Sequence, residues 1–246
     1  MKDKPFSYWL VIFGVTWGQI ILISSAIREP TAHNLTLMLA IQASGLYALI
    51  LYLLRRHWMP WVVKRPLANA CWVGIFNAAF IETLFWGIQK ILGATDVAAH
   101  PNLLVDLALT MPWYAGMVVL FVHAQGRRNF SLATVLLLGA LYEVGADGLV
   151  GGQIIPLISG KPVDFVGSWV LLVGLAFWQF IPVYSSMVLA PAWVLEGPPG
   201  SPRADKAHPI MKKNPGGKAW LDALIPLVWL APYTIYVIII MNLFEK

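Results

Sequence analysis

Long apolar stretches constrain the fold of this chain more than any other feature of its sequence. Each is about 20 residues or longer, the length that a helix needs to cross the hydrocarbon layer of a membrane. Only a backbone that satisfies its own hydrogen bonds is stable where water is absent, so these stretches are expected to be helices. Seven of them occur, at about residues 7–27, 35–54, 68–91, 103–123, 132–155, 165–194 and 219–244. The sequence therefore predicts an all-α, polytopic membrane helix bundle with about seven transmembrane helices.

The composition excludes an ordinary soluble protein. Hydrophobic residues make up 59% and charged residues 12% of the 246 residues, which is more apolar surface than a soluble core could bury. We find no internal repeat and no soluble domain. The expected organisation is two N-terminal transmembrane helices in residues 1–67, a four-helix unit in residues 68–195, and a polar loop with a C-terminal transmembrane helix in residues 196–246.

Basic residues predict the orientation of the bundle, because positively charged loops resist translocation. With seven helices, 13 of the 17 lysines and arginines lie on the side of the amino terminus and four on the other side. This division places the amino terminus in the cytosol and the carboxyl terminus across the membrane. A basic rim that contacts membrane lipids explains the pI of about 9.4, so no nucleic-acid partner is expected.

Four acidic residues interrupt the apolar stretches: Glu82, Asp106, Glu143 and Asp147. Inserting an ionised side chain into a membrane costs at least roughly 2.5 to 3.5 kcal/mol, so we expect all four to face the interior of the bundle. The directions of the helices place them in the non-cytosolic half of the membrane or at its border. Buried carboxyl groups are candidates for proton transfer, which makes these residues candidate acids or bases.

Two explanations stay open for Glu143 and Asp147. Their spacing of four residues puts them on one face of a helix, where they can act together. The glycines that surround them indicate instead a loosened or early-ending helix whose acids reach the lipid head groups. For Glu82, whose neighbours are apolar and aromatic, a functional role is the stronger interpretation.

Other chemistries find little support in the sequence. The five histidines lie mainly in loops or at the ends of apolar stretches, without the clustering that a metal site needs. The single cysteine, Cys71, has no partner for a disulfide or a thiolate site. We therefore predict neither a metal nor a cofactor. Trp113 and Trp178 lie well inside apolar stretches, where an indole either packs structurally or holds a carbocation by cation–π attraction.

Four segments resemble a known family, and one of them, residues 142–145 (YEVG), resembles the tyrosine and glycine pattern of that family's third helix. Residues 71–85, CWVGIFNAAFIETLF, resemble the first helix of the EXPERA domain, the family of the emopamil-binding protein (sterol Δ8-Δ7 isomerase) and its relatives. That helix carries a catalytic glutamate in a similar Ile-Glu-x-x-Phe pattern, which corresponds to Glu82. Residues 106–113, DLALTMPW, resemble a helix in which an acid precedes a tryptophan by seven residues, which corresponds to Asp106. Residues 176–182, AFWQFIP, resemble the stretch whose tryptophan faces the substrate, which corresponds to Trp178.

The resemblance covers about residues 68–195 and implies a cavity that admits a flat polycyclic or isoprenoid lipid. The chain departs from the family at two positions, with Ala78 in place of a histidine and Leu175 in place of an asparagine. It also has more helices than the five-helix plan of the isomerases. These departures favour membership of the family over the isomerase activity itself.

The predicted function is isomerisation of a sterol or terpenoid lipid, in which a double bond moves by protonation and deprotonation. Glu82 and Asp106 are the predicted acid and base, and Trp178 is the predicted stabiliser of the carbocation. The expected partners are a sterol or terpenoid lipid and membrane lipids, and a homodimer is one possible assembly. The expected location is the endoplasmic reticulum. The predicted substrate-binding residues are Asn77, Trp86, Thr110, Trp113, Tyr142, Glu143, Asp147 and Gln179.

Three alternatives to the isomerase remain. A membrane terpenoid cyclase, like the seven-helix cyclases of fungal meroterpenoid pathways, would pair two acids in the same way but would close rings. A non-catalytic sterol or lipid binder, as some EXPERA proteins are, is favoured by the replaced histidine and asparagine. A proton-coupled transporter is disfavoured because the sequence has no internal repeat.

Overall fold

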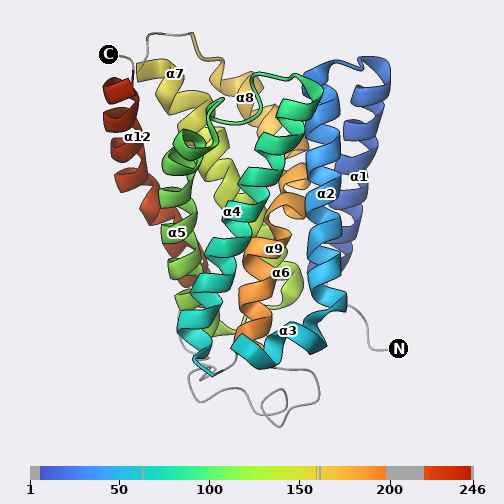
Figure 1. The fold of residues 1–246 in the computed structure, drawn as a ribbon, viewed down its shortest axis with the longest axis vertical. Coiled ribbons are helices and arrows are strands. Elements are labelled where there is room, and N and C mark those ends of the chain that lie inside the picture. Colours follow the sequence, from blue (N-terminus) through green and yellow to red (C-terminus); the bar gives the residue numbers. More distant parts are fainter. Residues whose placement is uncertain (1–5, 63, 159, 161, 198–218, 245–246) are drawn as a thin grey trace.

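Seven helices long and apolar enough to cross a membrane build the fold in the computed structural model, which describes residues 6–62, 64–158, 160, 162–197 and 219–244 (Figure 1). The chain is an integral membrane protein with an all-α, polytopic architecture, and the described residues form no strand. The fold class predicted from the apolar stretches is confirmed. The first four spans are continuous α-helices: α1 (Phe6–Arg28), α2 (Ala32–Leu53), α4 (Pro66–Leu92) and α5 (Leu103–Arg128).

The last three spans change helix type along their length, which the hydropathy of the sequence does not reveal. The fifth consists of α6 (Leu132–Glu143), a π-helix η1 (Val144–Ile154) and α7 (Ile155–Ile158). The sixth consists of α8 (Phe165–Leu171), a π-helix η2 (Leu172–Ala176) and α9 (Phe177–Glu196). The seventh consists of α11 (Ala219–Leu224), a 3-10 helix η3 (Ile225–Trp229) and α12 (Leu230–Phe244).

Local signals explain where the long helices begin and end. Thr31, Asn102 and Ser131 cap the amino termini of α2, α5 and α6, and each side chain accepts a hydrogen bond from a backbone N–H of the first turn. The left-handed conformation that closes a helix occurs at Gly93 after α4 and at Asn129 after α5, with φ of 74° and 50°. The stop at Asn129 leaves only residues 129–131 between α5 and α6, whereas residues 93–102 connect α4 to α5.

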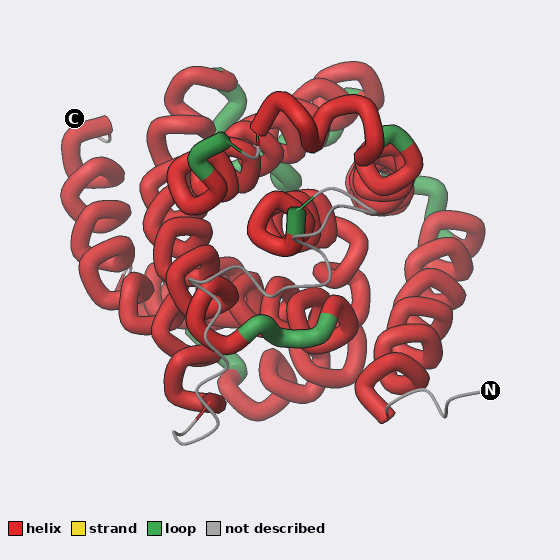
Figure 2. The backbone as a smooth tube through the Cα atoms, turned by 90° about the horizontal axis from the view of Figure 1, so that it is seen from below, coloured by secondary structure: helices red, strands yellow, loops and turns green. Residues whose placement is uncertain are grey.

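Helix α9 lies at the centre of the bundle and is surrounded by α1, α2, α4, α5 and α6 (Figure 2). Its segment from Ile181 to Leu195 is buried almost throughout. One hydrophobic core joins the helices, with Leu22 from α1, Ile41 from α2, Ile81 from α4 and Phe121 from α5 among its buried members. The first two helices therefore share a core with the four helices that follow them in the sequence.

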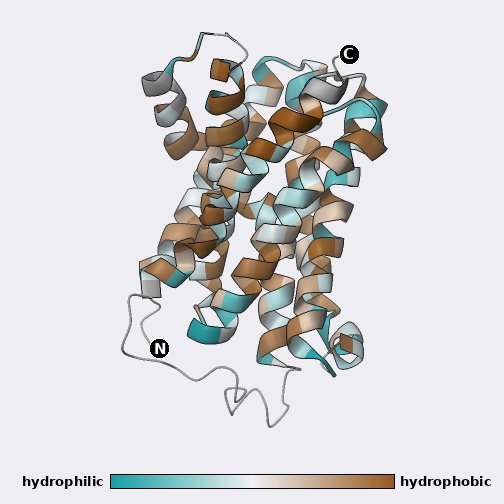
Figure 3. Ribbon diagram, turned by 90° about the vertical axis from the view of Figure 1, so that its left-hand side faces the viewer, coloured by the Kyte–Doolittle hydropathy of each residue, from teal (hydrophilic) through white to brown (hydrophobic). Residues whose placement is uncertain are grey.

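The outer surface of the bundle is apolar, as a lipid-facing surface requires. Figure 3 shows hydrophobic residues along most of the length of the outer helices. Large exposed side chains include Phe13 of α1, Leu46 of α2, Trp72 of α4 and Val228 of η3. Such a surface is stable when hydrocarbon covers it, which agrees with the membrane location.

Basic residues gather at one end of the bundle, which we name the basic end. A short helix that the sequence analysis did not expect, α3 (Arg55–Val62), lies at this end (Figure 1). The described bases there include Arg55, Arg56, Arg127 and Arg128. The charge rule predicts that the basic end faces the cytosol. The predicted polar loop that begins at Glu196 lies outside the described residues from residue 198 to residue 218.

Candidate intramembrane carboxyl site

Two tyrosines bind two of the four intramembrane acids. The phenol of Tyr114 in α5 donates a hydrogen bond to the carboxyl group of Glu82 in α4. The phenol of Tyr184 in α9 donates a hydrogen bond to the carboxyl group of Glu143 at the end of α6. Phenol to carboxylate contacts are charge-assisted and strong inside a membrane, where water cannot compete. Both acids are therefore held in fixed positions.

The two tyrosines also bring the two acids into one cluster. Their ring centroids are 5.8 Å apart, and the indole Nε1 of Trp113 donates a hydrogen bond of 3.3 Å to the phenol oxygen of Tyr184. Trp113, Tyr114 and Tyr184 are all buried. Together with the four acids, these three aromatic residues form what we name the carboxyl network.

Asp106 joins the carboxyl network from the first turn of α5. One of its oxygens accepts a hydrogen bond of 3.0 Å from the backbone N–H of His100, and the positive end of the α5 dipole favours an acid at this position. Its other oxygen, Oδ2, is buried and accepts no hydrogen bond from the described residues. The carboxyl groups of Asp106 and Glu82 interact. A shared proton would satisfy this oxygen.

Asp147 is the member of the carboxyl network that opens to a cavity. It lies in η1 next to Glu143, and the two carboxyl groups interact. The side chain of Asp147 is exposed and lines a cavity of about 400 Å³ between α5, η1 and α12. Apolar side chains cover most of the wall, and the ring of Tyr233 and the hydroxyl of Thr110 also line it. This volume is in the range of small-molecule binding sites.

Glycines explain why the helix that carries Asp147 is a π-helix. A side chain at Gly145 would meet Leu230 at 2.9 Å, and one at Gly148 would meet Leu172 at 2.8 Å. These glycines therefore let the backbone of η1 approach its neighbours, while they weaken the preference for an α-helix. π-helical turns occur frequently at functional sites. Of the two interpretations left open by the sequence, loosening of the helix is found, but Glu143 stays buried in the network.

Within the described residues, no acid of the carboxyl network forms an ion pair with a basic side chain. Among the described residues, Arg128 pairs with Asp222 near the basic end and His33 pairs with Asp96 at the opposite face. Neither pair involves an intramembrane acid. Acids that lie side by side in a medium of low dielectric constant cannot all be ionised, so neighbouring members must share protons. The arrangement is suited to storing and moving protons.

Some predicted substrate-binding residues lie in or near the site, and others have structural contacts. Thr110 lines the cavity, and Trp113 belongs to the network. Trp86 donates a hydrogen bond of 3.1 Å from its indole to the carbonyl of Pro101, in the loop before α5. Tyr142 donates one of 2.7 Å to the carbonyl of Ala223 in α11.

Asn77 ties three helices together. Its amide nitrogen donates a hydrogen bond of 2.9 Å to the carbonyl of Ser186 in α9, and its amide oxygen accepts one of 2.8 Å from the phenol of Tyr47 in α2. Its side chain is 3% exposed. These contacts use the polar atoms of Asn77 for packing between α2, α4 and α9.

The expectation that Trp178 lies beside Glu82 and Asp106 differs from the structure. Its ring packs so closely on Gly14 of α1 that a side chain at position 14 would overlap it, and its backbone faces Gly18 with that of Gln179. The small residues of α1 create this contact, and they turn Trp178 towards the first helix. The indole that reaches the carboxyl network is that of Trp113.

Tyr114, Tyr184 and Tyr233 were not predicted from the sequence. A signal was present, because a phenol inside an apolar stretch needs a hydrogen-bond partner, and the intramembrane acids are the natural acceptors. Tyr114 directly follows Trp113, and Tyr184 lies two residues after Pro182. Which acid each phenol reaches depends on helix packing, which no pattern in one chain specifies.

Comparisons with protein families, with curated proteins and with solved structures find no match to this chain.

Proposed function

We propose that this protein is a membrane-embedded isomerase that moves a carbon–carbon double bond in a sterol or terpenoid lipid. The observation that carries the proposal is the carboxyl network, whose member Asp147 opens to a largely apolar cavity of about 400 Å³. A double-bond shift needs one proton added and another removed, and no change in oxidation state. Linked carboxyl groups supply both steps.

The reaction begins with proton transfer from Asp147 to one carbon of the substrate double bond. The electron pair of the double bond forms the new C–H bond, and the neighbouring carbon becomes a carbocation. The ring of Tyr233, which lines the same cavity, stabilises this cation through its electron-rich face. Tyr233 takes the place that the sequence analysis gave to Trp178.

The reaction ends with removal of a proton from the carbon on the other side of the cation. The carboxylate of Asp147 accepts this proton, and the electron pair of the broken C–H bond forms the shifted double bond. Glu143 and Tyr184 hold protons next to Asp147, while Glu82 and Asp106 extend the same reserve through Tyr114. The net reaction consumes no proton.

The surroundings of the cavity suit a substrate that arrives from the membrane. Val237 and Met241 of α12 form part of its wall, and only 6% of the seventh span is buried. One loosely enclosed helix therefore separates the cavity from lipid. The proposed location is the endoplasmic reticulum, which is consistent with a sterol substrate.

The test is incubation of the purified protein in D₂O with a Δ8 sterol and, separately, with an epoxy-terpenoid. The expected product is an isomer of the sterol with one added deuterium, detected by mass spectrometry and located by NMR. Asp147→Asn should lower the rate of product formation at least about 100-fold, whereas Glu29→Gln, which changes an exposed acid outside the network, should not. Ring closure of the epoxide would identify a cyclase, and an unchanged but stoichiometric lipid would identify a binder. Either result would overturn the proposal.

A further inference from the structure

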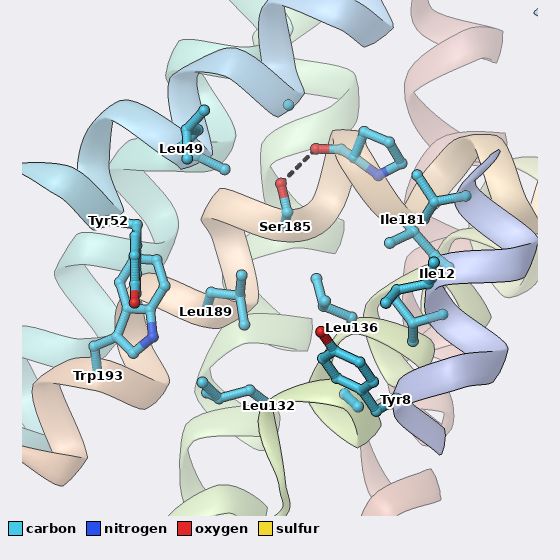
Figure 4. Close-up of a pocket in the computed structure, with 16 residues that line it drawn as sticks. Tyr8, Ile12, Leu49, Tyr52, Leu132, Leu136, Ile181, Ser185, Leu189 and Trp193 are labelled. Atoms are coloured by element: carbon cyan, nitrogen blue, oxygen red, sulfur yellow. Dashed lines mark hydrogen bonds between the residues drawn. The ribbon is translucent and has the colours of Figure 1, made fainter. Parts of the chain in front are cut away.

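A second cavity, which shares no lining residue with the cavity of Asp147, lies between α1, α2, α6 and α9. Its volume is about 450 Å³, and side chains such as Ile12, Leu49, Leu136 and Leu189 point into it (Figure 4). The hydroxyl of Ser185, on its wall, already donates a hydrogen bond of 2.6 Å to the carbonyl of Pro182. The cavity therefore favours a hydrocarbon chain over a polar ligand.

The depth of this cavity matches one leaflet of a membrane. Along α9 its lining runs from Trp193 near the basic end to Ile181, just over three turns or about 18 Å of helix. The hydrocarbon core of a bilayer is about 30 Å thick, so one leaflet is about half of that. An acyl chain whose head group lies at the basic end would fill the cavity along its length.

A polar hollow of about 440 Å³ adjoins the cavity at the basic end. The two spaces share three lining residues: Tyr52, Leu132 and Trp193. The hollow adds one cationic and one anionic side chain, Arg55 and Glu196. An apolar space thus continues into a space that carries one charge of each sign.

Arg55 is positioned to bind an anion. Its guanidinium carbon lies 3.8 Å from the centre of the Tyr52 ring, and one N–H donates a hydrogen bond of 3.0 Å to the carbonyl of Tyr52. A guanidinium has five N–H groups, so donors remain for a phosphate. Within the described part of the chain, no acid forms an ion pair with Arg55.

We propose that the cavity and the hollow together bind one zwitterionic phospholipid of the leaflet at the basic end. Its phosphate binds Arg55, its ammonium group lies beside Glu196 and the ring of Trp193, and one acyl chain fills the cavity. Glu196 disfavours an anionic head group, because that head group has no positive charge to offset the carboxylate. The presence of both charges therefore argues for phosphatidylethanolamine or phosphatidylcholine over phosphatidylglycerol.

Native mass spectrometry of the full chain tests the proposal. Phosphatidylethanolamine, phosphatidylcholine and phosphatidylglycerol with identical acyl chains are added to the delipidated protein in detergent, and the fraction with one bound lipid is measured. The two zwitterionic lipids should bind about tenfold more tightly than phosphatidylglycerol, as one charge-assisted contact predicts. Equal binding of all three lipids, or no bound lipid, would overturn the proposal.

Variants separate this site from general attraction to a basic surface. Arg55→Gln should weaken binding of all three lipids about tenfold, whereas Arg56→Gln, which removes an exposed neighbouring base that does not line the hollow, should leave it unchanged. Glu196→Gln should remove the discrimination against phosphatidylglycerol. Ala133→Phe, which fills the cavity without changing a charge, should prevent binding.

Thermal unfolding of each variant identifies any that fails to fold. If Arg55→Gln does not fold, the selectivity of Glu196→Gln decides the question by itself. An equal loss of binding in Arg56→Gln and Arg55→Gln would mean that surface charge alone attracts the lipid, and would refute the site. Full binding by Ala133→Phe would refute the acyl-chain position.

Discussion

The phenol of Tyr184 donates a hydrogen bond to the carboxyl group of Glu143 and so connects the central helix α9 to the end of α6. The connection lies where α6 widens into the π-helix η1, which carries Asp147. The indole of Trp113 donates to the same phenol from α5. The hydroxyl group of Tyr184 therefore connects α5, α6 and α9 through polar contacts inside the bundle.

Tyr184→Phe should destabilise the protein by about 1 to 3 kcal/mol, because it leaves a buried carboxyl group and a buried indole N–H without their partner. The free energy of unfolding in mixed detergent micelles measures this loss. Tyr236→Phe is the matched control, since its hydroxyl bonds the carbonyl of Ala108 outside the network. Equal losses in the two variants would contradict a special role for the connection.

Glu82→Gln should slow turnover at least about tenfold without abolishing it. Glu82 belongs to the network but does not line the cavity of Asp147, so its replacement should change how readily Asp147 gives up its proton without removing the group that transfers it. Asp147→Asn should cost about 10²- to 10⁴-fold, the usual contribution of a general acid. Rates of product formation in D₂O measure both losses. Identical rate profiles for the variants would place both residues in the same step.

Gly14→Ala should lower stability by about 1 to 3 kcal/mol, because the new methyl group would overlap the ring of Trp178. Gly87→Ala in α4 is the control, since nothing lies within 4 Å of a side chain at that position, and it should be neutral or slightly stabilising. Thermal unfolding measures both changes.

Trp178→Ala should remove most of the effect of Gly14→Ala when the two changes are combined. Strong coupling in this double-mutant cycle is expected for residues in direct contact. Additive effects would mean that the ring of Trp178 does not pack on α1.

The pair of His33 and Asp96 should make stability depend on acid pH. A hydrogen bond of 2.9 Å from the His33 ring lowers the pKa of the Asp96 carboxyl group below its usual value. An acid whose pKa is lower in the folded state stabilises that state at pH values above its unfolded pKa of about 3.9, and the effect disappears as pH falls through the folded pKa.

Melting temperatures of the wild type and of Asp96→Asn between pH 3 and pH 7 measure this dependence. The wild type should be the more stable protein above about pH 4, and the two should converge below it. The difference should be small, because both side chains are exposed to solvent. A constant difference over the whole range would exclude the carboxyl group as its source.

The sequence predicts the architecture well because the membrane imposes a simple rule on it. Each apolar stretch corresponds to a span, and the first predicted helix, residues 7–27, differs from α1 (Phe6–Arg28) by one residue at each end. The type of helix within a span depends on packing between distant residues. The π-helix η1 depends on contacts of Gly145 and Gly148 with distant leucines, which hydropathy does not encode.

The candidate site could be predicted only in part for the same reason. The cost of burying Glu82 and Glu143 in hydrocarbon implied that they face inwards, and both have a tyrosine partner in the bundle. Which aromatic residue approaches them depends on how the helices rotate. Trp178 turns towards the glycines of α1, and Trp113 reaches the network.

The enclosed position of α9 limits the order in which the bundle can assemble during synthesis. The five helices that surround it leave the ribosome earlier, and α12 leaves it later. Those earlier helices must therefore form an incomplete ring, open towards the lipid, until the segment of α9 from Ile181 to Leu195 moves into the gap. A chaperone or a translocon that shields this opening would act on the intermediate that exists after the fifth span has inserted and before the sixth has.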